Sequence, residues 1–214
     1  RCKKMKTDWQ NVHSKVQEKR KKVTFNTMQI IAFGFLGVIF LGSILLYLPI
    51  SNQEPIAYLD ALFVSVSAVC VTGLVTVFPA AQFTLFGKVV LLGLIQIGGL
   101  GVIACTMAVF LAIRKKITMK SRVMIQQTYN LETLSGMVRF IIRILKGTVL
   151  VEGIGAVLFA FHFVPEYGFI KGVAYGIFHS VSAFCNAGID VLGTSSFMEY
   201  VSSPLVSLTT MFLI

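Results

Sequence analysis

Charged residues are scarce in this sequence, and acidic residues are the scarcest of them. Only 13% of the 214 residues are charged and 9 are acidic, whereas 56% are hydrophobic and the mean hydropathy is +0.81. Soluble domains carry about 25% charged residues. A soluble fold of this length could not bury so much apolar surface. The composition therefore predicts an integral membrane protein that contacts the lipid bilayer.

Cysteine is also rare, and the common catalytic motifs are absent. Cys2, Cys70, Cys105 and Cys185 have neither metal-binding nor redox spacing. The sequence contains no Gly-x-Ser-x-Gly, no HExxH and no phosphate-binding glycine loop. We therefore expect no enzyme activity and no organic cofactor. The first residues are polar and basic, which is unlike a cleavable signal peptide. Because the sequence opens on Arg1 and stops inside an apolar run, we expect a piece of a longer chain.

The basic residues are concentrated in two blocks. Nine lysines and arginines lie within residues 1–22 and eight within residues 114–146, which leaves only Lys88 and Lys171 elsewhere. The net charge of +10 is therefore not spread over a surface that would bind nucleic acid. The positive-inside rule places both blocks in the cytoplasm. The pattern predicts a multi-pass protein of the plasma (cell inner) membrane with a cytoplasmic N-terminus.

Apolar segments follow the order long, short, long, and then long, short and the start of another long one. Long runs can span the roughly 30 Å hydrocarbon core as helices, whereas runs of 10–14 residues are more typical of re-entrant segments. We expect an all-α membrane protein of helix–pore loop–helix (M1-P-M2) repeats with re-entrant pore helices. The predicted divisions are a cytoplasmic N-terminal segment (1–26), a first repeat (27–113), a cytoplasmic connector (114–138) and a second, truncated repeat (139–214).

The two halves are related by duplication. Shifting the chain by 115 positions aligns identical residues in the short segments, namely Phe63 with Phe178, Ser65 with Ser180, Ser67 with Ser182, Cys70 with Cys185 and Gly73 with Gly188. Convergent hydrophobic composition rarely reproduces serine, cysteine and glycine in register. The pattern indicates a structural repeat.

The segment after each short helix is the candidate for ion binding. Non-helical backbone at membrane depth must be buried in protein or line a watery cavity. The C-terminal end of a helix favours a cation, and backbone carbonyls can replace the hydration shell of an ion. A glycine lets the loop turn its carbonyls inward. The predicted K⁺-binding filter residues are Val71, Thr72, Gly73, Asn186, Ala187 and Gly188.

Other polar residues within the apolar runs have two interpretations. Glu152 is either a buried structural carboxylate or part of an ion pathway, since intramembrane acids are costly. Gln96 is more typical of an interhelical hydrogen bond. Asp190 follows the second loop and is expected to face the outside. His179 has no cysteine or carboxylate at ligand spacing, so a metal site is not expected there.

Three stretches resemble the Ktr/Trk/HKT superfamily of potassium transporters, most closely the Ktr-type membrane subunit. They are Ser67–Leu74, Gln96–Gly101 and Ser182–Ile189. The first and third are similar to the pore loops of this family, and the second to the helix that follows the first pore loop. One departure is Ile189, where many relatives have phenylalanine. The resemblance implies four repeats around one pore, a homodimer and a cytoplasmic ring of nucleotide-binding regulatory subunits.

The predicted function is therefore potassium uptake across the plasma membrane, with sodium as a candidate coupling ion. A tandem-pore potassium channel is the first alternative, but its TVGYG-type filter has a second glycine that Thr72–Val75 and Ala187–Asp190 lack. A membrane scaffold or membrane-embedded enzyme is the second alternative. Ion flux through the full-length protein would separate this last class from the other two.

Overall fold

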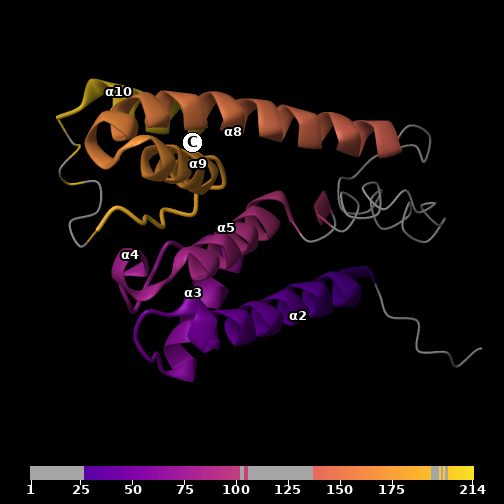
Figure 1. Ribbon diagram of the computed structural model, residues 1–214. Coiled ribbons are helices and arrows are strands. Elements are labelled where there is room, and N and C mark those ends of the chain that lie inside the picture. Colours follow the sequence, from indigo (N-terminus) through magenta and orange to yellow (C-terminus); the bar gives the residue numbers. More distant parts are fainter. Residues whose placement is uncertain (1–26, 102–103, 106–136, 194–197, 199, 201) are drawn as a thin grey trace, which may run out of the picture.

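The computed structural model describes residues 27–101, 104–105, 137–193, 198, 200 and 202–214 (Figure 1). These residues form an all-α structure without a β-strand apart from a single bridge between Asn52 and Phe83. The helices are α2 (Thr27–Tyr47), the 3₁₀ turn η1 (Pro49–Ser51), α3 (Tyr58–Val69), α4 (Pro79–Gln82), α5 (Leu85–Leu100), α8 (Met137–Tyr167), α9 (Phe169–Phe184) and α10 (Pro204–Leu213).

The helices fall into two groups that follow the predicted repeats (Figure 1). The first contains α2, α3 and α5, and the second contains α8, α9 and α10. The short helices α3 and α9 lie second in each group. Within the described residues, one helical stretch, Arg139–Tyr167, is long and apolar enough to cross a membrane. The helix α3 has 12 residues, or about 18 Å at 1.5 Å per residue.

A predicted boundary differs from the observed one. The first repeat was predicted to extend to residue 113, but its last described helix, α5, ends at Leu100 because Gly101 has a φ of 84°. By contrast, α8 continues through Pro165 to Tyr167. Pro165 has no N–H to donate to the Phe161 carbonyl, so α8 lacks one internal hydrogen bond in its last turns. The segment 1–26 and nearly all of the connector 114–138 lie outside the described residues.

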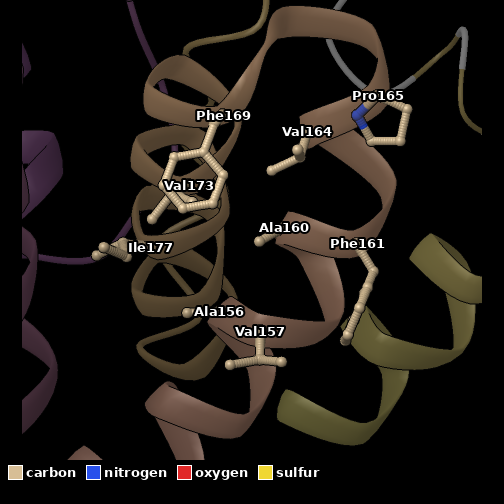
Figure 2. Close-up of a pocket in the computed structure, with 9 residues that line it drawn as sticks. All are labelled: Ala156, Val157, Ala160, Phe161, Val164, Pro165, Phe169, Val173 and Ile177. Carbon is tan, nitrogen blue, oxygen red and sulfur yellow. The ribbon is translucent and has the colours of Figure 1, made fainter.

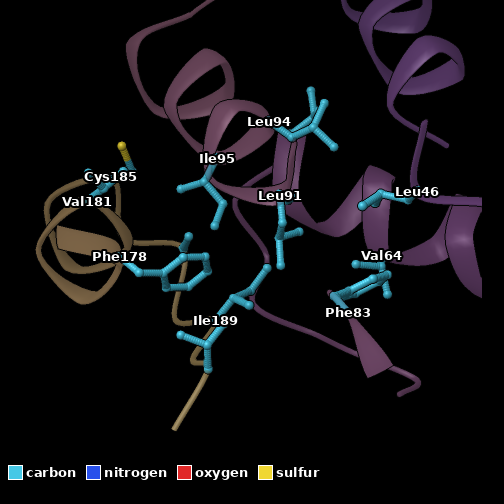
Figure 3. Close-up of a cluster of buried hydrophobic side chains, with 14 of the residues drawn as sticks. Leu46, Val64, Phe83, Leu91, Leu94, Ile95, Phe178, Val181, Cys185 and Ile189 are labelled. Atoms are coloured by element: carbon cyan, nitrogen blue, oxygen red, sulfur yellow. The ribbon is translucent and has the colours of Figure 1, made fainter. Parts of the chain in front are cut away.

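The main hydrophobic core joins the two repeats (Figure 3). Leu91 and Ile95 from α5 are fully buried beside Val64 from α3. Phe178 and Val181 from α9, together with its cap residue Cys185, belong to the same cluster. The short helix α9 of the second repeat therefore packs against α5 of the first repeat. This packing fixes the position of one loop relative to the other.

A recurring contact shows that the duplication extends to the packing. Ser65 Oγ donates to the Ile39 carbonyl at 2.8 Å, and Ser180 Oγ donates to the Glu152 carbonyl at 2.6 Å. A Cβ added to Gly42 would lie 2.6 Å from Ser65 Oγ, and one added to Gly155 would lie 2.5 Å from Ser180 Oγ. The equivalent contacts show that residues of α2 correspond to residues of α8 after a shift of 113 positions, as Ile39 does to Glu152. Residues of α3 correspond to residues of α9 after a shift of 115 positions, as Ser65 does to Ser180.

Candidate ion-binding site

The two short helices, α3 and α9, end in the same backbone arrangement. The cap residues Cys70 and Cys185 have φ/ψ angles of −84°/−1° and −78°/−3°. Beyond them, Thr72 N donates to Ser67 O at 3.0 Å, and Ala187 N donates to Ser182 O at 2.8 Å. A bond that spans six residues in this way is the signature of the Schellman motif. Each helix is therefore closed by its own backbone at the point where the loop begins.

The loops need left-handed backbone at two positions each. Val71 and Asn186 both have a φ of 57°, and the glycines two residues later, Gly73 and Gly188, have φ values of 75° and 66°. Asparagine tolerates this conformation, but a β-branched valine is a genuine outlier there. Such strain is concentrated at functional sites, where the surrounding structure maintains it. The matching angles extend the duplication to individual loop residues.

The loop carbonyl groups are left available by this arrangement. The amide groups of Thr72 and Ala187 are used to close the helices. Among the described residues, no hydrogen bond is donated to the carbonyl oxygens of residues 71–73 or 186–188. These oxygens lie at the C-terminal ends of α3 and α9, where the helix macrodipole favours a cation. The loops can therefore present neutral oxygen ligands to a cation that has lost its water.

The two loops meet each other. A Cβ added to Gly73 would lie 2.6 Å from the carbonyl oxygen of Ala187 and 3.7 Å from Gly188 Cα. A side chain at residue 73 would therefore be disfavoured twice, by the positive φ of this residue and by a clash with the Ala187 carbonyl oxygen. Gly188 has more space, because a Cβ there would find only Gly73 Cα, at 4.0 Å. The structure therefore places Gly73 of the first loop against Ala187 and Gly188 of the second, and the other three predicted residues adjoin them in sequence.

Comparison with known proteins agrees with this arrangement of two loops. Residues 7–214 match the TrkH family, which is described as "Cation transport protein". The chain belongs to the TrkH family. Because the match extends over nearly the whole sequence, it includes both loops and every helix described above.

Individual relatives of this TrkH-family chain are potassium uptake proteins by name. It is 39% identical over 193 residues to Ktr system potassium uptake protein B of Bacillus subtilis, covering 90% of this chain and 43% of the relative. It is 38% identical over 201 residues to Potassium/sodium uptake protein NtpJ of Enterococcus hirae, with coverages of 93% and 45%. Ktr system potassium uptake protein B of Vibrio alginolyticus is 36% identical over 191 residues, covering 89% of this chain and 42% of the relative. The chain spans less than half the length of these relatives.

In this TrkH-family chain, α5 supports both loops through adjacent glycines. A Cβ at Gly98 would collide with the Val69 carbonyl oxygen at the end of α3. A Cβ at Gly99 would collide with the Sγ of Cys185 and lie 2.6 Å from its Cβ. One helix therefore contacts the ends of both pore helices, which requires close approach of its backbone.

The other polar candidates form separate contacts. Gln96 Nε2 donates to Glu152 Oε1 at 2.8 Å, so these two residues, which were considered separately in the sequence, bridge α5 and α8. Asp190 instead accepts a 3.3 Å hydrogen bond from the Leu192 amide, two residues further along its own loop. His179 is buried, and it lines a cavity of about 180 Å³ with Asn186, Gly188 and Thr210. Within the described residues, no group of three or more histidine, cysteine or acidic side chains could hold a metal ion.

Sequence reasoning missed the supporting serines. Ser65 and Ser180 anchor the pore helices to the preceding helices, as described above, and Ser67 Oγ accepts a 2.9 Å hydrogen bond from Thr72 Oγ1. The equivalent Ser182 donates instead to the Ile189 carbonyl at 2.6 Å. The sequence did contain a signal for these contacts, because the same serines occur at matching positions of both repeats. A serine inside an apolar helix needs a hydrogen-bond partner.

Proposed function

We propose that the full protein containing this chain takes up potassium through a filter to which residues 71–73 and 186–188 contribute carbonyl oxygens. The observation that carries the proposal is the meeting of two equivalent loops, each at the C-terminal end of a short helix and each with carbonyls that accept no hydrogen bond from the described residues. The names of the relatives support potassium uptake. These matches favour a transporter subunit over a tandem-pore channel or a scaffold.

The proposed mechanism relies on backbone ligands. α3 and α9 enter the membrane from the outside as re-entrant helices, and their C-terminal ends lower the energy of a cation at the loops. The carbonyl oxygens replace the hydration shell, which is easier to remove from potassium than from the smaller sodium ion. Selectivity then depends on the number and geometry of the carbonyls. Neither Gln96 nor Glu152 is needed as an ion ligand, because their hydrogen bond gives both a structural role between the repeats.

The proposal extends to partners and to the coupling ion. The family resemblance implies a homodimer in which each protomer has its own pore, bound to a cytoplasmic ring of nucleotide-binding regulatory subunits. Sodium is the candidate coupling ion, because one relative is named a potassium/sodium uptake protein. Sodium dependence of potassium uptake by the purified full-length protein in vesicles would test this part of the proposal independently of the filter.

The filter is tested by Gly73→Ser in the full-length protein. The added side chain would meet the Ala187 carbonyl, so the geometry of both loops should change together. We expect at least tenfold weaker potassium affinity, which corresponds to about 1.4 kcal/mol, and a lower potassium-over-sodium preference. Potassium and sodium uptake are measured at equal membrane abundance.

Gly93→Ser is the control for this experiment. Gly93 lies in α5, and a Cβ there would have no heavy atom within 4 Å. This variant should keep wild-type affinity and ion preference. If Gly73→Ser behaves like wild type while Gly93→Ser changes ion preference, the filter assignment is wrong.

A further inference from the structure

An apolar groove runs between α8 and α9 of the second repeat (Figure 2). Its volume is about 470 Å³. Every residue that lines it is apolar, and they are Ala156, Val157, Ala160, Phe161, Val164, Pro165, Phe169, Val173 and Ile177. Phe161 and Phe169 are 70% and 74% exposed at its edges. The close-up shows the small side chains of Ala156 and Ala160 at the base.

At the positions of the first repeat that correspond to the groove, larger side chains are present. The register of 113 positions for the first helices pairs Ala160 with Tyr47, and the register of 115 for the pore helices pairs Val173 with Tyr58. The rings of Tyr47 and Tyr58 pack edge to face with centroids 5.7 Å apart. Ser43 Oγ lies 3.3 Å from the hydroxyl of Tyr58, whereas its counterpart in the groove is Ala156. At these aligned positions the second repeat therefore has smaller side chains, Ala156, Ala160 and Val173, and all three line the groove.

A following repeat would not cover this groove. α9 uses three different faces: Phe178, Val181 and Cys185 pack in the core shared with α5, whereas His179, Ser182 and Ala183 line the cavity shared with α10. The groove uses a third stripe, Phe169, Val173 and Ile177. Since α9 docks on α5 of the preceding repeat, the next pore helix would dock on α10 by the same rule. Phe169, Val173 and Ile177 lie neither on the α5-facing side nor on the α10-facing side of α9, so the groove that they line is open to the bilayer.

We propose that the groove binds one acyl chain of a phospholipid from the outer leaflet. Along α8 it extends from Ala156 to Pro165, which is about 14 Å at 1.5 Å per residue and close to half of the roughly 30 Å hydrocarbon core. The basic residues Arg139, Arg143 and Lys146 are at the opposite end of α8, so the positive-inside rule places the groove in the outer leaflet. The acyl chain fills the volume that the two tyrosines fill in the first repeat. This proposal requires insertion of α8 but not potassium selectivity.

The test counts the phospholipids retained by the full-length protein in native mass spectrometry. The probe is phosphatidylglycerol with one palmitoyl and one oleoyl chain, titrated into delipidated protein. The double variant Ala160→Tyr/Val173→Tyr closes the groove in the manner of the first repeat and should retain one lipid fewer per protomer. The reciprocal variant Tyr47→Ala/Tyr58→Val should retain one more. Ile170→Tyr is the control, because Ile170 is 84% exposed but does not line the groove.

Two results would overturn the proposal. The first is an unchanged lipid count in the reciprocal variant, or in the groove-closing variant where it folds. The second is a change in subunit number when the groove is closed, which would show that another protein chain occupies it. Failure of the Gly73→Ser experiment would leave the lipid result unaffected, because that experiment measures ion preference only.

Discussion

At the scale of single residues, the site depends on backbone conformations that most side chains disfavour. Val71 and Asn186 occupy the same left-handed position with the same φ of 57°. Asn186 is exposed, whereas Val71 is half-buried and packs against the core. The strain at Val71 is therefore offset by packing, and Asn186 avoids strain because its short polar side chain tolerates this region. The two loops reach one geometry with different residues.

We predict that Asn186→Val destabilises the full-length protein by about 1 kcal/mol. A left-handed conformation costs an ordinary residue about 1–2 kcal/mol, and the exposed position offers little packing in return. Asn186→Gly should be close to neutral, because glycine has no such penalty. The measurement is the apparent unfolding temperature in detergent. Equal unfolding temperatures for the valine and asparagine proteins would show that residue 186 is not left-handed.

The sequence could identify the glycines but not the contact between them. The repeat placed Gly73 and Gly188 in register after short helices, and both have positive φ as their role required. Sequence alone could not show that Gly73 approaches the Ala187 carbonyl, because that distance depends on how α9 packs against α5. The sequence analysis also treated the two glycines as equivalent, whereas only Gly73 has a carbonyl oxygen of the other loop close to the position of an added Cβ.

At the scale of elements, α5 is the helix that aligns the two loops. Its Gly98 and Gly99 contact the ends of α3 and α9, and its Gln96 binds Glu152 on α8. The sequence identified the Gln96–Gly101 stretch only through its resemblance to the helix that follows the first pore loop. The structure shows that Gly98 and Gly99 pack closely and that the helix ends at Leu100, beside Gly101. The end itself was not predicted, because the apolar run continues beyond it without a proline.

We predict that Gly98→Ala impairs the full-length protein while Gly93→Ala does not. The new methyl group at residue 98 would meet the backbone carbonyl of Val69, which cannot move without shifting the end of α3. Overpacking of this kind typically costs about 1–3 kcal/mol, so the apparent unfolding temperature and the potassium affinity should both fall.

Gly93→Ala is the matched control on the same helix. A Cβ at Gly93 would enter open space, and alanine favours the helix by about 0.5–1 kcal/mol. Its unfolding temperature should therefore stay the same or rise. If both substitutions lower potassium affinity equally, the effect comes from the helix as a whole and not from its contact with α3.

At the scale of the whole molecule, the duplication explains both what was predicted and what was not. The order of helices and the equivalence of the pore loops follow from the 115-residue register, and the structure keeps that equivalence in the serine contacts of α3 and α9. The differences between the repeats needed coordinates. Tyr47 and Tyr58 fill a space that Ala160 and Val173 leave open, and this becomes visible only when the first helices are aligned by 113 positions instead of 115.

The membrane topology is the last prediction. α3 is only 12 residues long, so a re-entrant path requires both of its ends to lie on the outer side of the bilayer centre. Asn52 donates to the Leu46 and Leu48 carbonyls, which makes the exposed neighbour Glu54 the better labelling position on that side. In a full-length protein without other cysteines, Glu54→Cys should react with an impermeant thiol reagent applied outside. Lys120→Cys, in the second basic block, should react only after permeabilisation. Labelling of both positions from outside intact cells would mean that the two blocks do not share the cytoplasmic side, and the re-entrant arrangement of α3 would then have to be abandoned.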